Sequence, residues 1–148
     1  MREFTVEPLY KVPERANLTD LVHAPATEVP NQVGLAKKVD GQWRDVTYAA
    51  FLAEVQSAAK GLVALGVSAG DRVAIMSRTS YEWSLLDFAI WEAGAVPVPI
   101  YETSSAEQVE WILRDSGAVA VFTELAANTA TAPESCRIHA TCSAEEVS

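Results

Sequence analysis

Polar side chains follow the ends of two short apolar stretches and are the residues best placed to bind a ligand. They are Arg78, after the stretch 73–76, and Tyr101, Glu102 and Thr103, after the stretch 96–100. Open parallel sheets bind ligands outside the carboxyl ends of their strands, so this position favours a binding role. Polar residues there are also ordinary loop and helix-capping residues. We predict Arg78, Tyr101 and Thr103 as substrate-pocket residues and predict no catalytic residue.

Two nucleotide-binding motifs are incomplete in this sequence. Gly61 and Gly66 have the spacing of P-loop glycines, but Val67 stands where a lysine must reach the phosphates. The pair also lies at the end of a predicted helix, whereas a P-loop runs from a strand into a helix. Residues 76–80 contain no glycine, which excludes the usual dinucleotide fingerprint after the first strand.

The remaining candidates for chemistry are a cysteine-histidine cluster and an isolated histidine. Cys136, His139 and Cys142 offer three zinc ligands, but a structural zinc ion takes four, so we predict no metal site. His23 stands among prolines and is predicted to be a surface residue. No catalytic triad can be derived from the spacing of the nucleophiles.

Composition restricts the class of protein. The 148 residues are 49% hydrophobic and carry a net charge of −9, which indicates one globular domain and excludes nucleic acid as the main partner. No apolar run is long enough to span a membrane, and the first residues lack the apolar core of a signal peptide. We therefore expect a cytoplasmic protein.

The central stretch, residues 66–101, predicts a strand, a helix and a second strand. The apolar run 73–76 suits a strand buried on both faces. Thr79 and Glu82 form a potential capping box at the start of the helix, and Gly94 suits its end. Pro97 and Pro99 alternate in the second strand, so their missing donors lie on one side and favour a sheet edge or a bulge.

The flanking segments complete a partial Rossmann-like α/β fold, in which a β-α-β-α-β unit follows a hairpin and a long amphipathic helix. The predicted segments are an extended, proline-containing lead-in over 1–32 that follows the surface, with a short turn at 17–22, a hairpin around Asp40-Gly41, a helix capped by Thr47 and running to Leu65, a helix capped by Ser105 and Gln108 or by Ser104 and Glu107, a strand at 118–122, and a loosely ordered tail over 125–148. An incomplete N-terminal subdomain thus occupies 33–124.

Several short sequence motifs, in a fixed order along the chain, support a family resemblance. They are W-x-x-V-T-Y at 43–48, A-L-G-V-x-x-G-D-R-V-A-I at 64–75, E-W at 82–83, D-x-A at 87–89 and G-A-V-x-V-P-I-Y at 94–101. The chain resembles the N-terminal part of AMP-forming acyl-CoA synthetases, in the long-chain fatty-acid–CoA ligase branch of the adenylate-forming superfamily. The resemblance runs from about Val33 to Glu124, and adenylation domains for amino or aryl acids are the nearest alternative.

The resemblance implies an enzyme that uses ATP and Mg²⁺ to convert a fatty acid to an acyl-adenylate, and CoA to displace AMP. Its phosphate loop, T-S-G-T-T-G-x-P-K, and its catalytic lysine have no counterpart, since no lysine follows Lys60. We expect this chain alone to bind none of these cofactors and to be inactive.

Three hypotheses remain open: an N-terminal fragment of a ligase, a non-catalytic interaction module, and one half of a split enzyme completed by a second chain. The change of composition at Leu125 is typical of a frameshift or a premature stop and favours the first hypothesis.

Overall fold

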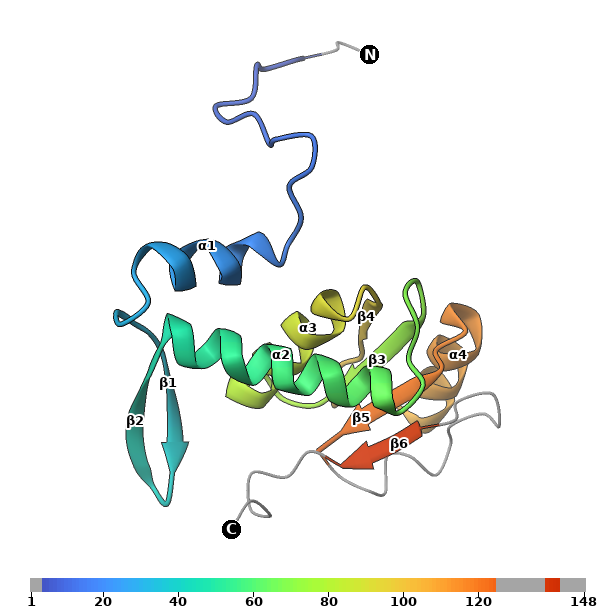
Figure 1. Cartoon of the computed structure of the whole chain (residues 1–148). Coiled ribbons are helices and arrows are strands. Elements are labelled where there is room, and N and C mark those ends of the chain that lie inside the picture. The colour runs from blue at the N-terminus through green and yellow to red at the C-terminus, as the bar shows by residue number, and fades with distance from the viewer. Residues whose placement is uncertain (1–3, 125–137, 142–148) are drawn as a thin grey trace.

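The computed structural model describes residues 4–124 and 138–141. Its elements are, in order, α1 (Asp20–Glu28), β1 (Val33–Val39), β2 (Gln42–Thr47), α2 (Tyr48–Ala64), β3 (Arg72–Met76), α3 (Tyr81–Glu92), β4 (Val96–Pro99), α4 (Ala106–Ser116), β5 (Ala120–Thr123) and β6 (Ile138–Thr141). The predicted β-α-β-α-β unit, with a hairpin and a long helix before it, is confirmed (Figure 1).

The main sheet has the strand order β4-β3-β5-β6, with all neighbours parallel. The backbone N–H groups of Val96, the first residue of β4, and of Ile100, just after its end, donate to the carbonyls of Asp71 and Ile75, so these positions face β3. Pro97 and Pro99 point the other way, where a missing donor breaks no bond within the described sheet. The predicted edge position of this strand is confirmed.

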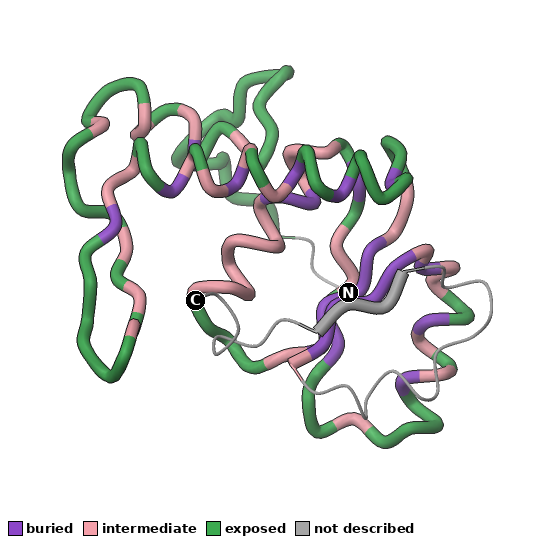
Figure 2. The backbone as a smooth tube through the Cα atoms, turned by 60° about the horizontal axis from the view of Figure 1, so that its bottom comes forward, coloured by how far each residue is buried: buried purple, intermediate pink, exposed green. Residues whose placement is uncertain are grey.

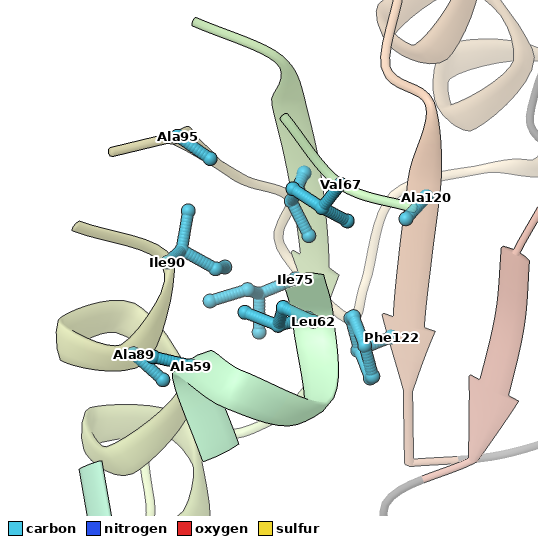
Figure 3. Close-up of a cluster of buried hydrophobic side chains, with 10 residues drawn as sticks. Ala59, Leu62, Val67, Ile75, Ala89, Ile90, Ala95, Ala120 and Phe122 are labelled. Carbon is cyan, nitrogen blue, oxygen red and sulfur yellow. The ribbon is translucent and has the colours of Figure 1, made fainter. Parts of the chain in front are cut away.

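Helices cover both faces of the sheet. On one face, Val73 and Ile75 of β3 pack with residues of α2 and α3, among them Leu62 and Ile90 (Figure 3). On the other face, Ala74 and Met76 of β3 pack with residues of α4. The central strands are therefore buried from both sides, as their continuous apolar sequence requires, and Figure 2 shows this buried centre.

The hairpin lies beside the helices and contacts them through apolar side chains, among them Leu35 and Val46, and through a polar cluster. Its turn places Asp40 and Gly41 at φ 51° and 75°, as the Asp-Gly pair predicts. Nζ of Lys37 donates to Oε1 of Glu54 over 3.0 Å, and the Tyr81 hydroxyl donates to Oε2 of the same carboxylate over 2.8 Å. One carboxylate thus joins β1, α2 and α3.

The helix caps agree with the sequence at two of three sites. The Thr47 side chain accepts from the Ala50 N–H, and Ser105 forms the full capping box with Gln108. For α3 the predicted cap at Thr79 is wrong. Ser80 is the N-cap and accepts from the Trp83 N–H over 3.2 Å, because Ser80 takes the extended backbone that a cap requires.

The lead-in is more structured than the sequence predicts. Helix α1 extends the expected turn through Pro25, because Val22 is buried against α2 residues and Nε2 of His23 lies 2.9 Å from Oε2 of Glu92. His23 is therefore half-buried in a contact with α3. Residues 4–16 extend away from the body, although the prolines suggest a segment that follows the surface (Figure 1).

Part of the C-terminal segment is regular. Ile138–Thr141 forms β6, which pairs with β5 along its length, in a segment for which the sequence predicts loose order. The pattern Ile-His-Ala-Thr is a weak strand signal, so pairing with β5 decides its conformation. The rest of the predicted tail lies outside the described residues.

Candidate functional site

A hollow lies at the carboxyl ends of β3 and β4, with a volume of about 530 Å³. Two loops form its walls, one leading from β3 into α3 and one leading from β4 towards α4. The lining residues are Ser77, Arg78, Thr79, Trp83, Pro99, Ile100, Tyr101 and Glu102. We call it the switch-point hollow, for the reason that follows.

The topology of the sheet explains why a hollow forms here. The chain leaves β3 for α3 on one face, and it leaves the neighbouring β4 for α4 on the opposite face. Where adjacent strands send their connections to opposite faces, the loops diverge and leave a crevice outside the strand ends. Doubly wound α/β proteins bind their ligands at such a point.

Arg78 links the ends of three strands at the rim of this hollow. Its Nε lies 3.1 and 3.2 Å from the two carboxylate oxygens of Glu124, which follows β5, and Nη2 also donates to Glu124. The Arg78 backbone N–H donates to Glu124 over 3.4 Å. Oε2 of Glu102, after β4, lies 3.8 Å from Nε. One guanidinium therefore contacts two carboxylates.

These contacts change the acidity of the groups involved. The hydrogen bond between the side chains, followed by charge attraction, raises the pKa of Arg78. The same side-chain hydrogen bond lowers the pKa of Glu124, against an opposing effect of burial. Both groups thus remain charged across the neutral pH range, and the guanidinium is paired.

The structure brings together most of the predicted site residues. Arg78, Tyr101 and Glu102 all line the hollow, and Tyr101 is 86% exposed. Thr103 lies on the exposed surface and is not among the lining residues.

Sequence reasoning missed two kinds of residue. Trp83 and Ile100 line the hollow, and the sequence predicts them only as members of a helix and of a strand. Glu124 was missed because its link to Arg78 depends on the pairing of β3 with β5. The one sequence signal for a role of Glu124 at the hollow is its position just after the end of a predicted strand.

The described residues do not fit ATP or Mg²⁺. None of their His, Cys, Asp and Glu side chains gather into a group of three that could hold a metal. Gly66 has a φ of 94° just after the end of α2, as the sequence predicts for a glycine at a helix end. Cys136 and Cys142 lie outside the described residues.

The part of the chain that the structure describes includes no helix both long enough and apolar enough to cross a bilayer.

Comparison with known proteins decides the family. The sequence model of the family described as AMP-binding enzyme matches residues 22–147. The chain belongs to this family. The match runs through residue 147, so the expectation that the resemblance ends at Glu124 is wrong, and a frameshift at Leu125 does not explain the following residues. Residues 125–147 are mostly small and polar, so their sequence alone does not indicate the family.

Several relatives within the family are described as fatty-acid–CoA ligases. The chain is 51% identical over 124 residues to the long-chain-fatty-acid–CoA ligase FadD15 of Mycobacterium bovis, covering 84% of this chain and 21% of the relative. A solved fatty acyl CoA synthetase of Mycobacterium tuberculosis is 30% identical, with a TM-score of 0.74 over 85% of this chain and 26% of that one. The solved N-terminal domain of FACL13 from the same organism is 29% identical, with a TM-score of 0.72 over 85% of this chain and 33% of that one. The chain thus spans about a fifth of the length of the curated relatives it matches.

Proposed function

We propose that this chain forms the N-terminal part of a long-chain fatty-acid–CoA ligase. The observation that carries the proposal is the 51% identity over 124 residues to a ligase with this activity. The reaction of the family joins a fatty acid to ATP as an acyl-adenylate, releases pyrophosphate, and transfers the acyl group to CoA with release of AMP. ATP, Mg²⁺ and CoA supply the activation and the acceptor thiol, and no residue of this chain is assigned to a step through them.

Within that enzyme, the switch-point hollow forms part of the wall of the acyl pocket. Trp83, Pro99 and Ile100 provide an apolar surface, and the position outside the strand ends is where open sheets bind ligands. Arg78 and Tyr101 are pocket residues in this proposal. The cytoplasmic location, the absence of a nucleic acid partner and a pocket role for Thr103 stay predictions from the sequence.

A chimera tests the proposed function. The corresponding segment of the FadD15 ligase is replaced by this chain, and formation of acyl-CoA from palmitate, ATP and CoA is measured. We expect the chimera to be active and the isolated chain to be inactive, because the phosphate loop is absent from its sequence.

A parallel reaction contains this chain and, as a separate polypeptide, the rest of the ligase. Activity there supports the split-enzyme form of the proposal, in which a second chain completes the fold. A folded chimera that forms no acyl-CoA would favour a non-catalytic interaction module instead.

A further inference from the structure

The charges around the switch-point hollow specify what it can accept. Among the described residues that line it, Arg78 is the one cation, and Glu102 is an anion. The guanidinium is already hydrogen-bonded to Glu124 outside the lining. The three charges together sum to minus one, so an anionic head group entering the hollow meets net repulsion.

The shape of the rim depends on the same contacts. Arg78 belongs to the loop after β3, and its two carboxylate partners belong to the segments after β4 and β5. The forked guanidinium bonds both oxygens of Glu124, which fixes orientation as well as distance.

We infer that Arg78 is a positioning and specificity-determining residue of the switch-point hollow, acting through Glu124 and Glu102. The contacts of Arg78 with these two carboxylates hold the ends of β3, β4 and β5 at a fixed separation and neutralise the charge of the guanidinium. The hollow therefore accepts an uncharged apolar chain and rejects a carboxylate. This inference rests on the proposed function, and it places the carboxyl group of a fatty acid outside this hollow.

The test measures binding of two probes to the purified 148-residue chain. Pyrene-labelled dodecanol is the neutral probe and pyrene-labelled dodecanoate is the anionic one, both used below their aggregation concentration. Energy transfer from Trp83, identified by its loss in Trp83→Phe, places a bound probe in the hollow.

The variants are Arg78→Gln, Glu124→Gln and the double substitution. Arg114→Gln is the matched control, because Arg114 is 71% exposed, against 69% for Arg78, and forms an ion pair with Glu110 on α4. The control is expected to bind both probes as the unsubstituted chain does.

The expected result has three parts. The unsubstituted chain binds the alcohol more tightly than the carboxylate. Each single variant weakens alcohol binding by about fivefold, which is the upper end of what an exposed ion pair contributes. The double variant binds the alcohol no more weakly than either single variant, because both substitutions remove the same contact. Glu124→Gln alone binds the carboxylate more tightly than the unsubstituted chain, because its guanidinium has lost a partner. A loss of folding would not produce this opposite change.

Two results would overturn the inference while leaving the proposed function in place. One is that Arg78→Gln and Glu124→Gln bind the alcohol as tightly as the control variant does. The other is tighter binding of the carboxylate by the unsubstituted chain that Arg78→Gln abolishes, which would make Arg78 a ligand-binding group. Failure of the unsubstituted chain to bind either probe would overturn the inference, and the chimera tests the proposed function separately.

Discussion

The Tyr81 hydroxyl donates a hydrogen bond of 2.8 Å to Oε2 of Glu54, and this bond connects the first turn of α3 to α2. Lys37 of the hairpin binds the same carboxylate, and its Nζ lies 4.8 Å from the centre of the Tyr81 ring. The ring of Tyr81 also meets Phe51 edge-on, with centroids 5.7 Å apart. The attachment of the hairpin therefore combines this polar cluster with the apolar packing of Leu35 and Val46 against α2 and α3.

The first prediction concerns stability at alkaline pH. Burial, then the hydrogen bond to Glu54, raises the pKa of Tyr81 above its ordinary value. A phenol whose folded pKa is raised stabilises the fold fully below its unfolded pKa of about 10, and this contribution is lost as pH rises through the folded pKa. Denaturant unfolding should show stability falling above pH 10 in the unsubstituted chain and falling less in Tyr81→Phe. An equal fall in both would contradict this role.

The second prediction compares two glycines. A Cβ on Gly34 would lie 2.7 Å from Cδ1 and 2.8 Å from Cζ of Tyr48, so Gly34→Ala should lower the free energy of unfolding by about 1–3 kcal/mol. A Cβ on Gly61, within α2, meets no atom within 4 Å. Gly61→Ala should raise the free energy of unfolding by about 0.5–1 kcal/mol. Urea unfolding of both variants checks the pair, and a similar loss in each would refute the packing argument.

The third prediction concerns the C-terminal end of α4. The Arg72 guanidinium donates to the carbonyls of Ser116 over 2.8 Å and of Gly117 and Gly70 over 3.1 Å. Carbonyls at a helix end have no partner within the helix, so Arg72 stabilises β3 and α4 together. Arg72→Met should lower the free energy of unfolding by about 1–3 kcal/mol.

Arg114→Met is the control for this effect, since it removes a surface ion pair on the same helix. Its change in the free energy of unfolding should stay within about 0.5 kcal/mol. Equal effects of the two variants would show that the contacts of Arg72 with the helix end contribute nothing.

The elements that the sequence predicted are those with local signals. Local interactions, within a few residues along the chain, determine the Asp40-Gly41 turn, the Thr47 cap and the placement of the two prolines of β4. Helix α1 and strand β6 lack such signals and depend on contacts with α2, α3 and β5. For the same reason, sequence position located Arg78 and Tyr101 at the hollow, whereas Glu124 required the strand order.

The central claim is that the switch-point hollow contacts the acyl chain of a fatty acid. Its most direct test is photo-crosslinking in the FadD15 chimera, using a long-chain fatty acid with a diazirine in its chain and mass spectrometry to locate the label. The account predicts label on Trp83, Ile100 or Tyr101, and competition by unlabelled palmitate. An active chimera whose competed label lies wholly outside residues 77–102 would contradict it.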